Sequence, residues 1–261
     1  MLVESIKKYT HYSKITYNNN TYDIENDIII KYNIAAGKRY NNELFTQILN
    51  ESTYSYYNRI SLNRLRRMRT KNEMITFLKE KDASDEIINK LIDKYIKHNY
   101  INDDYYTKYY IETRSHKEGP KLIYKKLNDK QIDKSIINKH LLNIDEKEII
   151  INYINRRIPK IKNKTKIQVQ NQMKKELVNK GYNYDLSNRL VNELINNFSF
   201  NEKQLIEKEF HKLYNRHKTK KEGYELTNYI KQSLYRKGFN MVLIDNIINQ
   251  NNNLLKKWYY V

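Results

Sequence analysis

Apolar residues recur along the chain in a pattern that repeats about every 50 residues. In each unit a Leu is followed three residues later by Lys, and two residues after that by a mostly apolar side chain. The phrase begins at Leu78, Leu127, Leu177 and Leu234, at spacings of 49, 50 and 57 residues. Met or Ile stands four residues before each Leu, and apolar residues recur nine, thirteen and fourteen residues after it, His140 being the one exception. Such offsets are typical of amphipathic helices, so each unit is predicted to hold at least two.

Polar residues with helix-capping chemistry mark where these helices begin. Three phrases combine an apolar residue, an Asn or Asp and an acid: Ile101-Asn102-Asp103, Ile144-Asp145-Glu146 and Phe200-Asn201-Glu202. They predict a further helix before the other two, because the capping side chain accepts from a free N–H and the acid favours the positive helix end. Thr70 with Glu73 has capping-box spacing, Ser84 is suited to begin the next helix, and Gly119-Pro120 places Pro in a first turn.

We therefore predict a mostly α-helical protein, an elongated tandem array of three-helix repeats with a small N-terminal α+β module. The predicted segments are the module, 1–53, and the repeats, 54–100, 101–143, 144–199 and 200–261. Within the module, alternation around an Asn tract predicts a hairpin over Ile15–Ile24. Asp27–Ile34 fits either a strand or a short helix, and Asn41–Asn50 fits a helix. We expect the module to pack on the first repeat and cover its open end.

Composition agrees with a helical fold and excludes several kinds of site. Five Gly and two Pro in 261 residues are too few for a β-sandwich or barrel. The lack of Cys excludes disulfides and thiolate sites, and the isolated Gly residues exclude a Gly-rich phosphate loop. The six His show no pair at helical metal-site spacing. Asp103-Asp104 fits a metal or general-acid role, but the repeated cap pattern explains it more simply. We expect neither a cofactor nor an enzyme.

The start of the chain lacks the continuous apolar stretch of a secretory signal, and no run is long enough to span a membrane. These features predict a cytoplasmic protein.

The net excess of positive charge is confined to the predicted repeats. The chain has 49 Lys and Arg against 30 Asp and Glu, a net charge of +19, whereas residues 1–53 carry six of each sign. Basic residues gather where the first helix of each repeat joins the second: Arg64, Arg66, Arg67, Arg69 and Lys71; Arg114, Lys117 and Lys121; Arg156, Arg157, Lys160, Lys162, Lys164 and Lys166; Arg216, Lys218, Lys220 and Lys221. Stacked repeats would align them as a basic stripe suited to a phosphate backbone or an acidic protein surface. A solvated face is the alternative for any one cluster.

Four tyrosines of the second repeat, Tyr105, Tyr106, Tyr109 and Tyr110, have helical spacing. We expect them to pack in the core, with stacking on nucleic-acid bases as the alternative.

Several stretches share a pattern with a known protein family. They are Arg66-Arg67-Met68-Arg69-Thr70-Lys71-Asn72-Glu73-Met74 with Leu78–Lys81; Tyr100–Tyr106 with Arg114-Ser115, Lys117–Pro120, Ile123 and Leu127; and, before them, residues 12–51. On these residues the sequence resembles the RecX family of recombination regulators over nearly its whole length, more weakly in the last two repeats. Asp82 and Gln131 stand where Gly is common in the family. We expect this to change the turn but not the architecture.

The resemblance implies a non-enzymatic protein that binds the RecA recombinase filament on single-stranded DNA, and we expect it to be a monomer. It would lie along the groove of the filament and modulate it, the expected sense being inhibition of ATPase activity and strand exchange. The alternative is a free-standing nucleic-acid-binding protein that contacts the DNA backbone through the basic stripe, on single or double strands. A purely structural scaffold is disfavoured because the charge is localised. The family has no catalytic residues to transfer.

Overall fold

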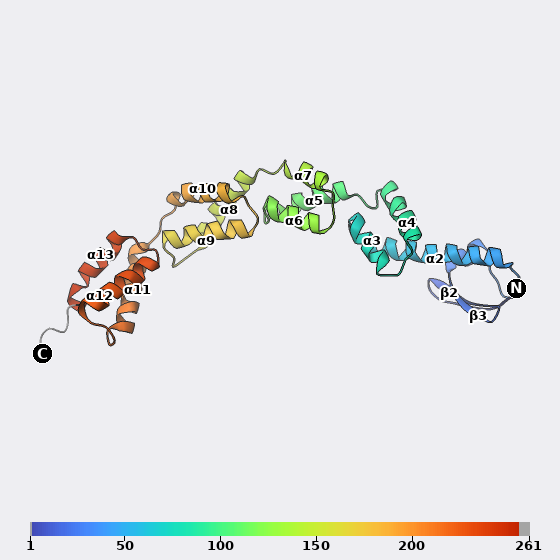
Figure 1. Ribbon diagram of the computed structural model, residues 1–261, viewed down its shortest axis with the longest axis horizontal. Coiled ribbons are helices and arrows are strands. Elements are labelled where there is room, and N and C mark those ends of the chain that lie inside the picture. Colours follow the sequence, from blue (N-terminus) through green and yellow to red (C-terminus); the bar gives the residue numbers. More distant parts are fainter. Residues whose placement is uncertain (1, 256–261) are drawn as a thin grey trace. The chain divides into compact units, whose positions relative to one another are not determined.

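The computed structural model describes residues 2–255 (Figure 1). It is mostly helical, with a three-stranded antiparallel sheet near the N-terminus, which confirms the predicted fold class. Met1 and residues 256–261, the ends of the first and last predicted segments, lie outside the described residues.

The chain forms two compact units. One comprises residues 1–110 and 127–137, and the other comprises residues 111–126 and 138–261. The predicted second repeat, 101–143, contributes residues to both units, and the boundaries of the five predicted segments stay predictions.

The N-terminal sheet has the strand order β1-β2-β3. Its strands are Val3–Lys8, Tyr12–Tyr17 and Asn20–Glu25. The two residues between β2 and β3, Asn18 and Asn19, both have positive φ, 52° and 61°. Such a turn matches the twist of a hairpin, and Asn tolerates it, so the predicted hairpin is confirmed. The sequence does not predict strand β1, because a register shift between Val3 and Ser5 interrupts the alternation of its side chains.

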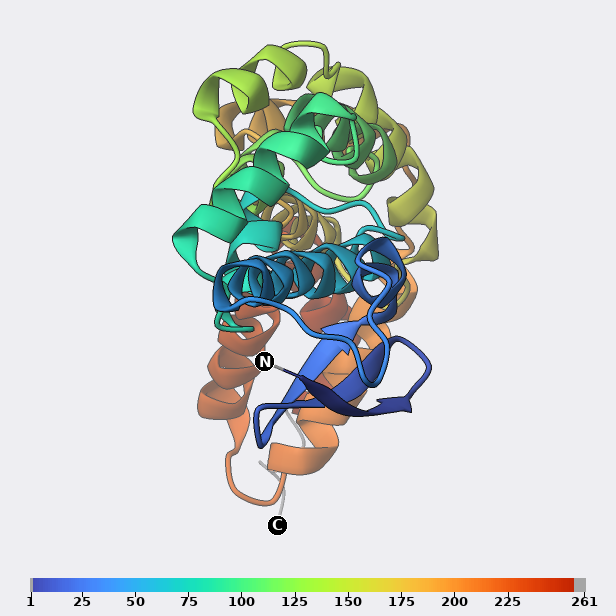
Figure 2. The ribbon, with the colours of Figure 1, turned by 90° about the vertical axis from the view of Figure 1, so that its right-hand side faces the viewer.

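Two helices complete the N-terminal module: one matches the helical alternative left open by the sequence, and the other is longer than predicted. The ambiguous segment forms helix α1, Asn26–Lys31, where the Asp27 carboxylate accepts from the N–H of Ile28 at 3.0 Å. Helix α2 runs over 23 residues, Asn42–Arg64, so the expected boundary at 53/54 falls inside a continuous helix. The same helix therefore covers the sheet and begins the first repeat (Figure 2).

A ring stack and an ion pair are among the contacts that hold α2 against the strands. Phe45 stacks on Tyr17 with 3.7 Å between ring centroids. The carboxylate of Glu25, which is 5% exposed, accepts two hydrogen bonds from the Arg59 guanidinium at 2.6 and 2.8 Å. A buried carboxylate needs such a partner, so this pair fixes where the sheet lies on the helix.

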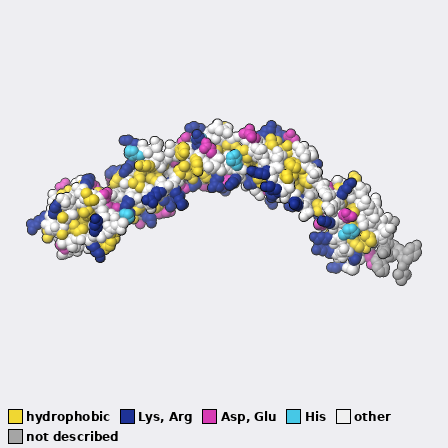
Figure 3. Space-filling view, turned by 180° about the vertical axis from the view of Figure 1, so that it is seen from behind, with side chains coloured by type: hydrophobic (Ala, Val, Ile, Leu, Met, Phe, Trp, Pro, Cys, Tyr) yellow, Lys and Arg dark blue, Asp and Glu magenta, His cyan; other side chains and the backbone are white. Residues whose placement is uncertain are grey.

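The rest of the chain is built from short helices, and its surface carries recurring Lys and Arg side chains (Figure 3). After α2 the helices are α3 Lys71–Lys79, α4 Asp85–Lys97, α5 Asp103–Arg114, α6 Pro120–Asp129, α7 Lys134–Leu141, α8 Glu146–Arg157, α9 Lys166–Asn179, α10 Tyr184–Leu194, α11 Glu202–His217, α12 Gly223–Arg236, α13 Met241–Gln250 and α14 Asn252–Leu255. Two 3-10 turns, Ile158–Lys160 and Ile195–Asn197, follow α8 and α10.

The predicted caps hold the starts of these helices. Asn102, Asp145 and Asn201 each accept from the main-chain N–H three residues on. Thr70 and Glu73 form the expected capping box before α3. Because free N–H groups at a helix start need acceptors, these residues decide where each helix begins.

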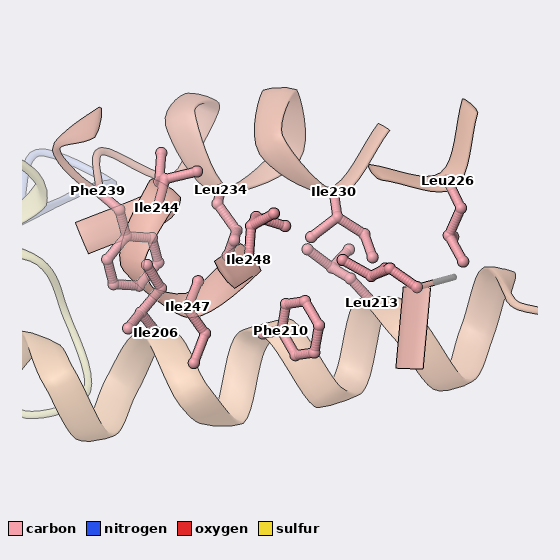
Figure 4. Packing of buried hydrophobic residues seen from close by; sticks show 11 residues of the cluster. Ile206, Phe210, Leu213, Leu226, Ile230, Leu234, Phe239, Ile244, Ile247 and Ile248 are labelled. Carbon is pink, nitrogen blue, oxygen red and sulfur yellow. The ribbon is translucent and has the colours of Figure 1, made fainter. Parts of the chain in front are cut away.

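The recurring Leu residues lie at the centre of each repeat. Leu78, Leu127, Leu177 and Leu234 are all 0% exposed, as are Met74, Ile123, Met173 and Ile230 four residues earlier. In the last repeat, side chains of α11, α12 and α13 close around Phe210 (Figure 4). The first, third and last repeats each bury a small hydrophobic core, as the apolar pattern predicts.

The middle helix of a repeat begins beside the first helix of the next repeat. The N–H of Lys71, at the start of α3, donates to Asp103 Oδ1 at the start of α5, at 2.9 Å. The N–H of Lys166, at the start of α9, donates to Glu202 Oε1 at the start of α11, at 2.7 Å. The two junctions therefore share one register, in which an acid of the next repeat satisfies a free helix N–H.

Middle helices also meet end to end. At the start of α6, the N–H of Gly119 donates to the carbonyl of Lys180 at 2.7 Å, and the N–H of Lys121 donates to that of Gly181 at 3.1 Å. These carbonyls end α9. Because a helix start is partially positive and a helix end partially negative, the contact is favourable.

The residue that ends each middle helix adopts the left-handed conformation. Its φ is 60° at Asp82, 59° at Gln131, 86° at Gly181 and 85° at Gly238. The two positions that depart from the family's Gly therefore keep the same kind of turn, contrary to the expectation that the turn would change.

Replacing Gly119 by Ala is expected to lower the free energy of unfolding by about 3 kcal/mol. A Cβ at this position would lie 2.4 Å from main-chain atoms of Gly181 and Tyr182, which have no flexible end to swing aside. The control is Gly223→Ala, where φ is +52° and nothing lies within 4 Å of the added carbon; its cost should be about 1 kcal/mol. Urea unfolding followed by circular dichroism measures both, and equal losses would contradict the close approach.

Candidate nucleic-acid interface

The predicted basic residues lie at the connections between the first and middle helices. We name them by connection: the first cluster joins α2 to α3 (Arg64, Arg66, Arg67, Arg69, Lys71), the second joins α5 to α6 (Arg114, Lys117, Lys121), the third joins α8 to α9 (Arg156, Arg157, Lys160, Lys162, Lys164, Lys166), and the fourth joins α11 to α12 (Arg216, Lys218, Lys220, Lys221). The first lies in one compact unit and the other three in the other. Their alignment into one stripe stays a prediction.

Most of these side chains face solvent. The exceptions are half-buried: Arg69, Arg157, Lys166 and Lys221. Exposure leaves a cation able to approach a phosphate, whereas a half-buried one is partly committed to the fold. The clusters therefore contain residues with different roles, which the sequence does not distinguish.

Arg157 is committed to a contact within the third repeat. Its Nε and Nη2 donate to the two carboxylate oxygens of Glu176, both at 3.1 Å. Tyr153 and Gln172 donate to the same carboxylate, at 2.8 and 2.6 Å. Burial by itself would raise the pKa of Glu176, but the hydrogen bonds from Arg157, Gln172 and Tyr153 outweigh it and lower the pKa to about 2. Arg157 thus joins α8 to α9.

Other members of the clusters have weaker contacts. Lys166 Nζ donates to Asn196 at 2.7 Å, and Lys164 Nζ donates to Gln172 at 2.6 Å. Lys221 pairs with Glu225 one helical turn away. Such exposed contacts contribute little stability, so they compete weakly with a ligand.

The first cluster contains an incompletely satisfied arginine. The guanidinium of Arg64 lies over the Phe77 ring, 5.3 Å from its centroid. Arg69 Nε is buried, and no hydrogen-bond partner for it occurs in residues 2–255. Arg66, Arg67 and the side chain of Lys71 are exposed. This connection therefore presents several cations at its surface.

A pocket lies beside the third cluster. Its volume is about 280 Å³, and it is lined by the connection Ile161–Lys164 together with the segment that begins α11. Three lysines, Lys162, Lys164 and Lys208, contribute to the lining, and no acidic residue does. Lys208 is missing from the predicted set, because only the fold brings this residue of α11 beside a connection some 40 positions earlier. A pocket of this charge suits an anion.

The four tyrosines of α5 divide into two pairs. Tyr106 and Tyr110 are half-buried, as expected of core residues, with 6.2 Å between their ring centroids. Tyr105 and Tyr109 are 57% and 50% exposed, so the expectation that they pack in the core is wrong. Helical spacing shows that two residues share a face but not which way that face points.

Residues 2–255 contain no group of three or more His, Asp or Glu that could hold a metal ion. Asp103, the predicted cap-region acid, accepts from the N–H of Lys71, and burial raises its pKa. The position of Asp103 fits the interpretation that it belongs to a repeated helix-cap pattern. Within the same described range, no helix combines the length and apolar character needed to cross a membrane.

This chain is similar to proteins named regulatory protein RecX. The chain is 28% identical to regulatory protein RecX of Streptococcus uberis over 235 residues, which cover 87% of this chain and 90% of the relative. It is 30% identical to regulatory protein RecX of Streptococcus pneumoniae (strain Hungary19A-6) over 221 residues, covering 83% and 86%. No protein-family model matches the chain.

Two solved structures are also similar. The crystal structure of RecX from Lactobacillus salivarius has a TM-score of 0.50 and 27% identity, covering 54% of this chain and 96% of that one. A second structure, titled crystal structure of regulatory protein RecX, has a TM-score of 0.54 and 19% identity, covering 76% and 99%. The latter supports the fold alone.

Replacing Arg157 by Ala is expected to lower the free energy of unfolding at pH 7 by about 2 kcal/mol, because Glu176 loses a half-buried charged partner. Arg156→Ala removes the same charge at an exposed neighbouring position and should cost less than about 0.5 kcal/mol. Urea unfolding of both variants measures the difference.

The difference in the free energy of unfolding between Arg157→Ala and Arg156→Ala should depend on pH. The pKa of Glu176 is lower in the folded protein, so the stabilisation is complete above its ordinary value of 4.5 and is lost as the pH falls toward about 2. A gap between the variants that does not narrow below pH 4 would contradict the assignment.

Proposed function

We propose that this chain, which belongs to the RecX family of regulatory proteins, binds RecA recombinase filaments on single-stranded DNA and inhibits them. It would act by binding, without a reaction of its own. The family membership supports a regulatory role, and the distribution of charge supports a polyanionic partner.

The observation that carries this proposal is the recurrence of exposed cations at one position of successive repeats. Basic residues lie at every connection between a first and a middle helix, whereas residues 1–53 have no net charge. A DNA backbone presents phosphates at regular intervals, so a repeating set of cations suits it better than one compact pocket would. Cations on loops hold the phosphate backbone of the DNA in place and do not select a base sequence.

A second candidate function is nucleic-acid binding without a recombinase partner. The lysine-lined pocket beside the third cluster favours it, because that pocket offers an anion site independent of RecA. A protein that acts only through backbone contacts should lose its effect steeply as salt rises.

The proposal is tested by removing charge from the third cluster. The variant Arg156→Ala, Lys160→Ala, Lys162→Ala replaces three exposed cations and leaves Arg157 in its pair with Glu176. We expect binding to single-stranded DNA, or to RecA filaments on it, to weaken about tenfold, and the slope of affinity against salt to fall by about 2.

The matched control removes the same charge from the same repeat: Lys147→Ala, Lys175→Ala, Arg189→Ala, all at exposed positions outside the clusters. It should bind nearly as the wild type does. Equal losses in the two variants would mean that net charge, and not the cluster, determines binding.

The DNA-dependent ATPase rate of the cognate RecA separates the two candidate functions. The wild-type chain should lower that rate when it is present in amounts too small to coat the DNA. A rate that falls only once the DNA is saturated would contradict filament regulation and favour simple competition for the strand.

A further inference from the structure

Helix α5 presents aromatic rings to solvent on one face. Tyr105 and Tyr109 are 57% and 50% exposed and stand four residues apart, so their rings lie one turn apart on the helix. Lys108, between them, is exposed, while Thr107 and Ile111 form the buried side. Large exposed rings that recur on one helix face mark a contact surface when a complementary partner can be identified.

The pocket beside the third cluster shows what lies next to the equivalent face of α11, the first helix of the last repeat. There, Gln204 and Lys208 of α11 line the same pocket as Lys162 and Lys164 of the preceding connection. One face of a first helix therefore lies next to the basic connection of the repeat before it.

The first two repeats have the same junction. The main-chain N–H of Lys71 donates to Asp103 just as that of Lys166 donates to Glu202. Residues at equal distances along the chain from these two hydrogen bonds therefore correspond. The corresponding pairs are Arg67 with Lys162, Arg69 with Lys164, Tyr105 with Gln204 and Tyr109 with Lys208. The exposed tyrosines of α5 thus occupy the positions that line the pocket in the later junction, next to the first basic cluster.

We propose that Tyr105 and Tyr109 stack on unpaired bases of single-stranded DNA whose phosphates lie on the neighbouring connection, at the exposed Arg67. Aromatic rings beside cations are the two components that bind a single strand without sequence preference. The charge of the neighbouring connection favours this occupant over an apolar protein surface. Asp103, an acid at the junction, accepts a hydrogen bond from the main-chain N–H of Lys71. In a duplex the bases are already stacked and paired, so this face discriminates in favour of single strands.

The inference rests on the proposed contact between the basic clusters and DNA, and it is tested without RecA. Fluorescence anisotropy would measure the binding of the full chain to a labelled single-stranded oligonucleotide, to an abasic oligonucleotide of the same length, and to a duplex. The wild type should bind the base-bearing single strand at least about tenfold more tightly than the abasic strand. Equal binding to the two would overturn the proposal without need of any variant.

Variants assign the effect to the two rings. Tyr105→Ala with Tyr109→Ala should weaken binding to the base-bearing strand about tenfold for each ring and leave abasic binding unchanged. The salt dependence should stay that of the wild type, because no charge is removed. Tyr105→Phe with Tyr109→Phe should restore binding, since stacking needs the ring and not the hydroxyl.

The control pair, Tyr184→Ala with Tyr224→Ala, removes rings that are 56% and 82% exposed elsewhere in the chain and should bind as the wild type does. A loss in the control pair equal to that in the α5 pair, or an equal loss on abasic DNA, would overturn the assignment. A chain that fails these tests can still lower RecA ATPase activity, and one that passes can fail to do so, so the two proposals fail separately.

Discussion

The structure depends on how the start of a middle helix is satisfied. A helix start has free N–H groups that need acceptors, and a short helix cannot supply them. Here an acid from the next repeat accepts one of them, as Asp103 does for Lys71 and Glu202 does for Lys166. The hydrogen bond therefore joins two repeats, and it forms at the residue where a basic connection ends and the middle helix begins. The proposals for this surface follow, because the first and third connections are held beside the first helix of the next repeat.

This arrangement separates the residues that hold the fold from those that are free to bind. Within the third cluster, Arg157 joins two helices through Glu176, whereas Arg156 beside it faces solvent. The difference arises from helix geometry, because neighbouring residues on α8 point about 100° apart. Only one of them can face α9. A basic run at the end of a helix therefore contributes cations to both the packed and the exposed side, and its residues cannot be treated as equivalent.

Local patterns predict what local contacts cause. Capping residues, the buried Leu of each repeat and the Asn-rich hairpin turn act within a few positions, so the sequence reveals them. The positions of the basic connections follow from the same helix boundaries. Contacts between distant positions do not: the Glu25–Arg59 pair spans 34 residues and anchors the sheet on α2, while Lys208 and the outer face of α5 acquire their surroundings only from packing between repeats. Burial at such places depends on the orientation of a helix, which its own sequence leaves open.

Two middle helices end in the same left-handed turn but make different contacts there. Gly181 has no side chain, and a Cβ on it would lie 2.5 Å from Leu122, so only Gly permits the main-chain hydrogen bonds between α9 and α6. Gln131 holds the same left-handed turn at the end of α6 but carries a side chain. At that end a side-chain ion pair, Lys130 with Glu73, links α6 to α3. Salt screens an ion pair and leaves main-chain hydrogen bonds nearly unaffected. The same left-handed turn is thus followed by a main-chain contact at Gly181 and by a side-chain ion pair at Lys130.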